Sequence, residues 1–100
     1  MQNDGLREGD REQIFAVLRQ FPSVDRAYLF GSRAMGNFKP HSDIDLAIDG
    51  EITEQQLGSI AGELEELPLP YKFDVIDLRK VELPALREHV AKHGREFWRS

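Results

Sequence analysis

The sequence predicts one α/β (or α+β) domain with a small mixed sheet of three to four strands flanked by helices. Two observations predict this class. Segments with apolar residues at helical spacing alternate with short apolar runs typical of strands, in the order α-β-(α)-β-α-β-α. The 100 residues, of which 40% are hydrophobic and 31% charged, suit one modest core. We therefore expect a flexible lead-in at 1–9 and a single domain at 10–100.

Each expected element begins or ends at a recognisable signal. Asp10 and Thr53 each have a Gln three residues later, the pattern of a capping box at a helix N-terminus. Prolines end or begin the helical segments, and Gly31 and Asp49-Gly50 are turn signals. The elements expected are a helix from Asp10 to Phe21, a strand Val24–Phe30, a helical turn at 32–36, a loop Asn37–Ser42, a strand Asp43–Ile48, a helix from Thr53 to Leu67, a strand Tyr71–Leu78, a helix from Pro84 that Gly94 caps, and a short strand Glu96–Arg99.

The composition excludes several classes of function. There is no cysteine, which removes disulfides, thiolate zinc sites and cysteine nucleophiles. No apolar run is long enough for a membrane span and the polar start is unlike a secretory signal, so we expect a cytoplasmic protein. The net charge is −5, and residues 40–70 hold eight acids and no Lys or Arg. We expect no direct nucleic-acid binding, because that depends on basic side chains; divalent cations or a basic partner suit the chain better.

Two pairs of residues carry the expected chemistry. Asp43 and Asp45 are two apart at the start of a strand, so both side chains project from one face. Their repulsion favours a cation between them, and Mg²⁺ is commonly held by carboxylates together with substrate phosphates. Gly31 and Ser32 follow a strand, where glycine permits close backbone approach and the hydroxyl and N–H groups suit a phosphate. Taken alone, each pair is more often an exposed strand end or an ordinary turn.

A third carboxylate is expected on the strand Tyr71–Leu78. Asp74 and Asp77 project from opposite faces of this strand. Asp74 lies inside the apolar run, where an unpaired charge is costly, whereas Asp77 also suits a cap for the following segment. We therefore favour Asp74 as the group that completes a metal site or takes a proton from an attacking hydroxyl.

The joint pattern of these residues resembles a known signature. Gly31-Ser32, ten residues, then Asp43-Ile44-Asp45 is similar to the motif of the nucleotidyltransferase superfamily related to DNA polymerase beta. LFGSRAMG and SDIDLAI more closely resemble the minimal nucleotidyltransferases, the small MntA-like proteins of bacteria and archaea. The resemblance covers residues 10–98 and implies the nucleotidyltransferase fold.

The resemblance also implies a role for each motif residue. Asp43 and Asp45 would bind two Mg²⁺ ions that also hold the triphosphate of ATP. Asp74 would bind the catalytic metal and help to activate the acceptor hydroxyl. Gly31 and Ser32 would hold the β- and γ-phosphates, while the acceptor oxygen attacks the α-phosphorus and pyrophosphate leaves.

Five further polar residues have alternative roles. Arg33 and Lys39 are placed to contact phosphate, with a structural or surface role as the alternative. His41 lies in the loop of the expected site and is a weaker candidate for substrate contact. His89 and His93 have the i, i+4 spacing of a metal pair, but no third ligand is evident, so we interpret them as a surface pair.

Three functions remain open on the sequence. The resemblance implies transfer of a nucleotide, AMP from ATP, to a hydroxyl on a partner protein, because the chain is too short for an acceptor domain. Members of the family commonly act as antitoxins paired with an all-helical HEPN-domain toxin, an RNase, and some adenylylate a tyrosine of that toxin. The alternatives are a non-catalytic subunit that neutralises or assembles with a HEPN partner, and transfer to a small molecule such as an antibiotic with a second subunit. The intact carboxylates and Ser32 favour the enzyme.

Overall fold

A four-stranded sheet organises residues 4–100, the part of the chain that the computed structural model describes. The strand order is β3-β2-β1-β4. β1 pairs antiparallel with β2 and β4, and β2 pairs parallel with β3, which confirms the predicted mixed sheet. The elements are α1 (Glu8–Arg19), β1 (Val24–Phe30), α2 (Ser32–Met35), β2 (Ile44–Gly50), α3 (Glu54–Glu65), β3 (Phe73–Asp77), α4 (Pro84–His93) and β4 (Arg95–Arg99).

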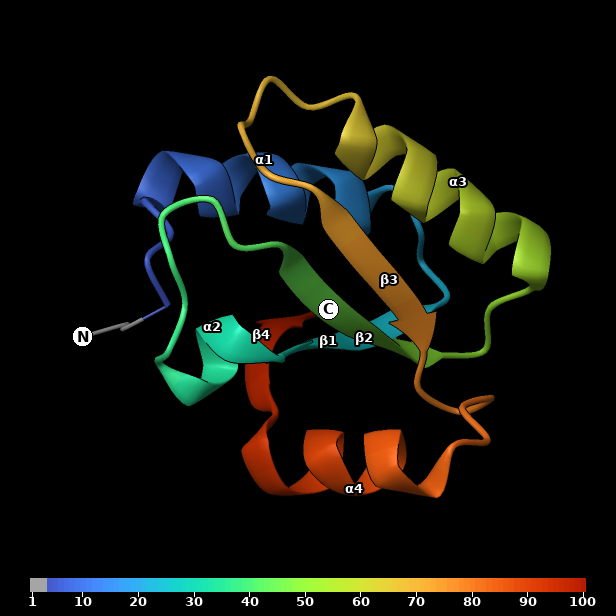
Figure 1. The fold of residues 1–100 in the computed structure, drawn as a ribbon. Helices are drawn as coiled ribbons and strands as arrows, with labels where there is room; N and C mark the ends of the chain where they lie inside the picture. Colours follow the sequence, from blue (N-terminus) through green and yellow to red (C-terminus); the bar gives the residue numbers. More distant parts are fainter. Residues whose placement is uncertain (1–3) are drawn as a thin grey trace.

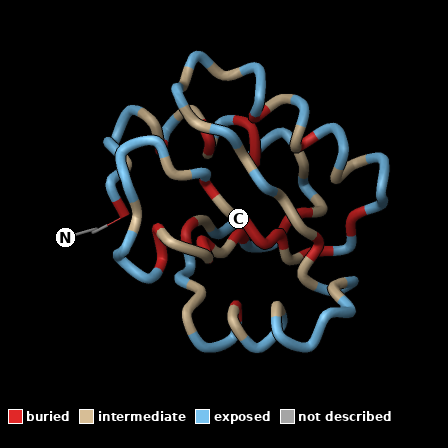
Figure 2. Tube along the Cα trace, in the orientation of Figure 1, coloured by how far each residue is buried: buried red, intermediate tan, exposed pale blue. Residues whose placement is uncertain are grey.

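The helices cover the two faces of this sheet unequally. α1 and α3 lie together on one face, and α4 lies on the other (Figure 1). The buried residues concentrate on the central strands (Figure 2). Alternation along β2 puts Ile44 and Leu46 in the large core beneath α1 and α3, and Ala47 in a small cluster with Val90 of α4. The face that α4 covers therefore has the smaller apolar cluster, which leaves more of it available for polar side chains.

The start of α1 differs from the sequence prediction. The helix begins at Glu8 with Arg7 as its N-cap. Asp10 is not the cap; it lies in the first turn, where its Oδ2 accepts the N–H of Arg7 at 3.2 Å. The capping box predicted from Asp10 and Gln13 was therefore wrong. An acid in the first turn of a helix and an acid at the cap both satisfy free N–H groups, so the sequence pattern fits either position.

The ends of the later helices follow their signals more closely. Thr53 Oγ1 accepts the N–H of Gln56 at 3.0 Å, and Gln56 Oε1 accepts the N–H of Thr53 at 2.9 Å, which confirms the second capping box. α4 begins at Pro84 and is capped by Gly94. Gly94 has an extended backbone (φ −64°, ψ 142°), and a Cβ there would overlap the carbonyl oxygen of Val90. Close packing, and not a left-handed conformation, is what requires glycine at this position.

The segment before α1 packs onto the domain. Asp4 is buried; its carboxylate pairs with Arg11, and its Oδ1 accepts the N–H of Leu6 at 3.0 Å. Gly5 lies against the ring of Phe38. The first three residues of the expected lead-in lie outside the described residues. From residue 4 onward, the N-terminal segment contacts the loop that precedes β2.

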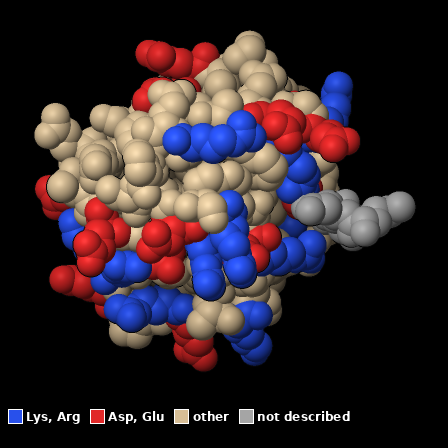
Figure 3. Space-filling model, turned by 180° about the vertical axis from the view of Figure 1, so that it is seen from behind, with Lys and Arg blue, Asp and Glu red and all other residues tan. Residues whose placement is uncertain are grey.

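The outer surface carries both signs of charge. In the view from behind, acidic and basic side chains are interspersed over much of the surface (Figure 3). Exposed pairs such as Arg26–Glu96, with a 3.8 Å separation, contribute little to stability because water screens them. None of the helices between residues 4 and 100 is long and apolar enough to cross a membrane.

Candidate active site

The glycine-serine turn and the first carboxylates meet on the α4 face of the sheet. β1 and β2 are antiparallel, with Phe30 opposite Asp45, so Gly31 at the end of β1 comes next to Asp45. A Cβ on Gly31 would overlap Oδ2 of Asp45. The backbone of Gly31 has φ 74° and ψ −154°, a conformation essentially confined to glycine. Glycine is required here both by the backbone conformation and by the close carboxylate.

Asp74 reaches the same place from β3. It is the register partner of Asp45 on the neighbouring parallel strand, and register partners project from the same face of a sheet. Asp77 projects from the opposite face and is buried, where it accepts the N–H of Arg79 at 3.0 Å and lies 3.8 Å from Nζ of Lys80. The structure thus brings Asp74 to Asp45 and leaves Asp77 to stabilise the end of the strand.

The carboxylates oppose one another's ionisation. The pKa of Asp45 is raised to about 6, first by burial and then by the negative charges of Asp74 and Asp43. The positive charge of Arg33 lowers it only in part. Asp43, just before β2, is exposed. Asp45 is therefore an anion held in an unfavourable place, which a bound cation would relieve.

The carboxylates match the ligand preferences of Mg²⁺ when a substrate completes its shell. No group of three or more His, Cys, Asp or Glu side chains in residues 4–100 converges closely enough to hold a metal ion alone. Mg²⁺, however, prefers hard oxygen ligands and usually keeps waters and substrate phosphates in its shell, so one or two carboxylates suffice. Asp43, Asp45 and Asp74 fit this chemistry, and they are the residues that would hold the ion.

Arg33 stabilises the segment between the Gly31-Ser32 turn and Asp43 through hydrogen bonds to backbone carbonyls. Its side chain is 1% exposed. Nη1 donates to the carbonyl of Asp4 at 2.8 Å, and Nε and Nη2 donate to the carbonyl of Ser42 at 3.2 and 3.0 Å. The rings of Phe38 and Tyr71 lie 5.1 and 4.9 Å from the guanidinium carbon. This geometry favours the structural alternative for Arg33, because its donors are occupied by carbonyls of the N-terminal segment and of the loop that leads to β2.

The other two loop residues lie at the surface. Lys39 and His41 are both exposed. The backbone N–H of Lys39 donates to Oγ of Ser42 at 2.7 Å, which closes the turn before Asp43. The structure thus assigns the backbone of Lys39 a part in shaping the loop and leaves both side chains open to solvent.

One residue at the site was missed by the sequence analysis. We interpreted His89 and His93 as a surface pair, but Nε2 of His89 accepts the N–H of Gly31 at 3.0 Å. The two histidine rings lie 5.2 Å apart. The available signal was the position of His89 beside Val90, on the face of α4 that packs against the sheet. Helical spacing alone did not show which loop that face would meet.

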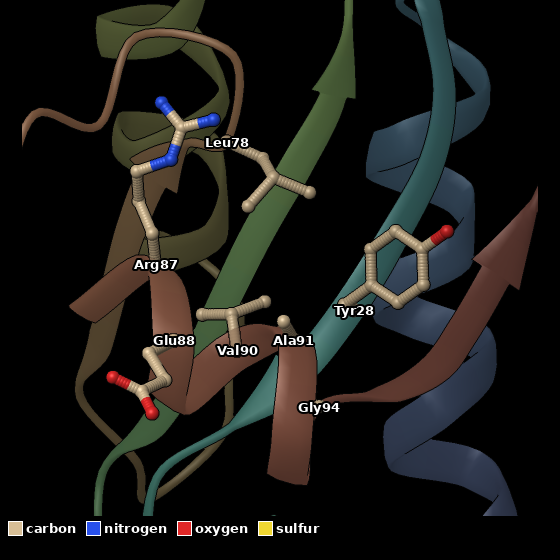
Figure 4. Close-up of a pocket in the computed structure, with 7 residues that line it drawn as sticks. All are labelled: Tyr28, Leu78, Arg87, Glu88, Val90, Ala91 and Gly94. Carbon is tan, nitrogen blue, oxygen red and sulfur yellow. The ribbon is translucent and has the colours of Figure 1, made fainter. Parts of the chain in front are cut away.

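A groove lies beneath α4, separate from the carboxylates. Its volume is ≈ 580 Å³. Figure 4 shows Tyr28 on its strand side and Arg87 and Glu88 on its helix side. It is lined by Tyr28, Leu78, Arg87, Glu88, Val90, Ala91 and Gly94. The candidate site is thus an open cluster at the ends of strands, on the same face of the sheet as this groove.

Comparison with family models decides the family. The polymerase beta nucleotidyltransferase family matches residues 12–100, which include every carboxylate of the site. The chain belongs to this family. Comparison with curated protein sequences found no match.

Solved structures agree with this nucleotidyltransferase assignment. A toxin–antitoxin structure with AMP-PNP is 28% identical, with a TM-score of 0.74, covering 90% of this chain and 73% of its own. A structure of the toxin–antitoxin MntA-HepT is 25% identical, with a TM-score of 0.69, covering 94% and 74%. A complex of a tri-AMPylated Shewanella oneidensis HEPN toxin with MNT antitoxin is 24% identical, with a TM-score of 0.71, covering 95% and 74%. This last likeness supports the fold.

Substitution of the glycine of the nucleotidyltransferase motif is expected to be more costly than substitution of a neighbouring glycine. Gly31→Ala adds a Cβ that overlaps Asp45 and forces alanine into a glycine-only conformation, with an expected cost of more than about 2 kcal/mol. Gly36 also has a positive φ, of 85°, but open space around it. Gly36→Ala should therefore cost about 1 kcal/mol from strain alone. Urea unfolding measures both; equal losses would contradict the close contact with Asp45.

Proposed function

We propose that this chain is a Mg²⁺-dependent nucleotidyltransferase that moves AMP from ATP to a hydroxyl group on a partner protein. The observation that carries the proposal is the meeting of Asp45, Asp74 and the Gly31-Ser32 turn on one face of the sheet. Family membership supports nucleotide transfer. Similarity to a structure with AMP-PNP supports an adenine nucleotide as the donor.

In the proposed mechanism the chain's own residues hold and orient the two reactants. Asp43, Asp45 and Asp74 would hold Mg²⁺, and the bound ion would stabilise negative charge on the attacking and leaving oxygens. Ser32 binds the β- and γ-phosphates through its hydroxyl and backbone N–H, while Gly31 permits their close approach. Asp74 is exposed beside Asp45, and it accepts the proton of the acceptor hydroxyl. The acceptor oxygen bonds to the α-phosphorus, the bond to the β-phosphate breaks, and pyrophosphate leaves.

We infer that the acceptor lies on a HEPN-domain toxin and that this chain is its antitoxin. The sequence resemblance implies this pairing. Its support from structure is the similarity, at 28% and 25% identity, to chains of toxin–antitoxin structures. In this assignment the acceptor hydroxyl approaches Asp74 from solvent, because no helix of residues 4–100 covers the exposed carboxylates.

A labelling experiment tests the function. The chain is incubated with Mg²⁺, ATP labelled at the α-phosphate and a HEPN-domain partner, and label on the partner is measured. Asp43→Asn/Asp45→Asn is expected to reduce the transfer rate by about a thousandfold or more, equal to about 4 kcal/mol of transition-state stabilisation. Asp49→Asn is the matched control on the same strand and face, since Asp49 pairs with Nε of Arg79 at 2.9 Å.

Each alternative function has its own outcome. A tight complex with no label transferred by the unaltered chain would make it a binding subunit. Label on an added small molecule but not on the partner would favour small-molecule transfer. Transfer that survives the double substitution would show that these carboxylates are not the site.

A further inference from the structure

The contact between His89 and Gly31 joins the last helix to the nucleotide-binding turn. The N–H of Gly31 donates to Nε2 of His89 at 3.0 Å, across 58 residues of sequence. Gly31 has a backbone conformation of the glycine-only region. Such conformations persist only where surrounding contacts hold them, and they concentrate at functional sites. His89 supplies one of those contacts.

The imidazole of His89 is itself held in place. Its ring meets that of Phe30 edge-on, with centroids 6.1 Å apart and an interplanar angle of 76°. Val90, the next residue, is buried with Phe30 and Ala47 and anchors α4 to the sheet. In this contact Nε2 is the acceptor of the Gly31 N–H. The helix thus presents a fixed acceptor to the Gly31 peptide.

The orientation of this peptide affects both halves of the site. On one side, Gly31 is in contact with the carboxylate of Asp45. On the other, it precedes Ser32, the proposed phosphate ligand. Rotation of the Phe30–Gly31 peptide would therefore change the distance between the groups that hold the phosphates and the carboxylates that hold the metal. Displacements of about 1 Å in such sites reduce rates by up to about a hundredfold.

We propose that His89 is a positioning residue for the nucleotide triphosphate, acting through the backbone of Gly31. This inference rests on the proposed function, because the triphosphate is what spans Ser32 and the carboxylates. His89 holds the turn in the conformation that glycine alone adopts, and it does so without itself contacting the nucleotide. It also gives α4 a role in the reaction that the motif residues do not reveal.

Paired substitutions separate the hydrogen bond from the packing of the ring. His89→Phe keeps an aromatic ring against Phe30 but removes the acceptor. His89→Gln loses the ring but retains an acceptor in its amide oxygen. His93→Phe is the matched control, because His93 lies on the same helix and contacts the His89 ring. The Gly31 amide is followed by ¹⁵N NMR and hydrogen exchange, and kcat/KM for ATP is measured in the transfer assay.

His89→Phe is expected to speed exchange of the Gly31 amide and to reduce kcat/KM for ATP by about five- to a hundredfold. His89→Gln should restore kcat/KM to within about threefold of the unaltered chain, and His93→Phe should leave it unchanged. A loss in His89→Gln as large as, or larger than, the loss in His89→Phe would overturn the proposal, because an acceptor at this position would then restore nothing. Faster exchange of the Gly31 amide in His89→Phe with an unchanged kcat/KM would also overturn it.

The proposal and the function beneath it fail in different ways. If the unaltered chain binds ATP and Mg²⁺ but transfers nothing, only the proposed function fails. The dissociation constant for ATP, measured from the shift of the Ser32 amide signal, then replaces kcat/KM as the readout. We expect His89→Phe to raise this constant by about five- to a hundredfold. If the unaltered chain does not bind ATP with Mg²⁺, both fail.

Discussion

Replacing Asp45 with asparagine is expected to stop nucleotide transfer and, at neutral pH, to stabilise the fold. Transfer is lost because asparagine is a poor Mg²⁺ ligand beside Asp43 and Asp74. Stability rises because the substitution removes a carboxylate that burial and two neighbouring acids make unfavourable in its ionised form. The site carboxylates are thus expected to favour activity at the expense of folding free energy.

The raised pKa of Asp45 determines whether its ionisation increases or decreases the stability of the fold. The pKa of Asp45 is raised to about 6 in the folded chain from its ordinary value of 3.8. Between these values the folded chain holds a proton that the unfolded chain releases, so this carboxyl reduces stability as pH rises from about 4 to about 6. Above about pH 6 this carboxyl lowers the stability no further. A shift of this size corresponds to about 3 kcal/mol for a buried group, but Asp45 is half-exposed and solvent screening reduces it to about 1 kcal/mol.

Thermal unfolding at several pH values measures the effect. At pH 7.5 Asp45→Asn should melt about 4–8 °C above the unaltered chain, and the difference should vanish below about pH 4. Adding Mg²⁺ should stabilise the unaltered chain more than the variant. Asp49→Asn, which loses the ion pair with Arg79, should show no such gain. A lower melting temperature for Asp45→Asn at pH 7.5 would contradict the repulsion.

Replacing Arg33 with methionine is expected to destabilise the fold more than Gly31→Ala does. The substitution keeps the length of the side chain but leaves the carbonyls of Asp4, Pro40 and Ser42 without their donor. Hydrogen bonds from a charged group contribute about 1.5–3 kcal/mol each. We expect a loss of about 3 kcal/mol or more, or a melting temperature lower by at least about 12 °C.

Two further variants separate the structural role of Arg33 from phosphate binding. Lys39→Met, which removes an exposed charge from the same loop, should change stability by less than about 0.5 kcal/mol. Arg33→Lys keeps the charge but lacks the planar fork that reaches two carbonyls at once, so it should also be destabilised. If Arg33→Met instead melts like the unaltered chain and binds ATP weakly, Arg33 contacts phosphate.

Much of the fold followed from local sequence signals. The capping box of Thr53 and Gln56, the strand Val24–Phe30 and the helix starting at Pro84 all occur where their patterns predicted. These signals depend on residues within a few positions of one another, so they can be identified without knowing how distant segments pack. Asp10 was one exception, because two helix positions have the same local chemistry. The strands predicted at Asp43–Ile48 and Tyr71–Leu78 also have other bounds, Ile44–Gly50 and Phe73–Asp77.

For the carboxylates of the site, too, some features were predictable from local sequence and others depended on tertiary structure. Strand alternation predicts that Asp43 and Asp45 share a face. In the structure β2 begins at Ile44, so Asp43 lies just before the strand, although its negative charge still raises the pKa of Asp45. The choice between Asp74 and Asp77 depended on the pairing of β3 with β2, which puts Asp74 and not Asp77 beside Asp45. Strand register is set by packing between segments, so the sequence supported only a preference.

The roles of Arg33 and His89 came from the three-dimensional structure. Arg33 is read from sequence as a basic residue beside a phosphate-binding turn, yet its donors meet carbonyls from the chain start and from the loop before β2. His89 is read as half of a surface pair, yet it accepts the N–H of Gly31, which lies 58 residues away along the chain. Sequence alone was sufficient for the types and spacing of the chemical groups, because they depend on the order of residues along the chain. Which donor meets which acceptor depends on how distant segments pack, and only folding brings those segments together.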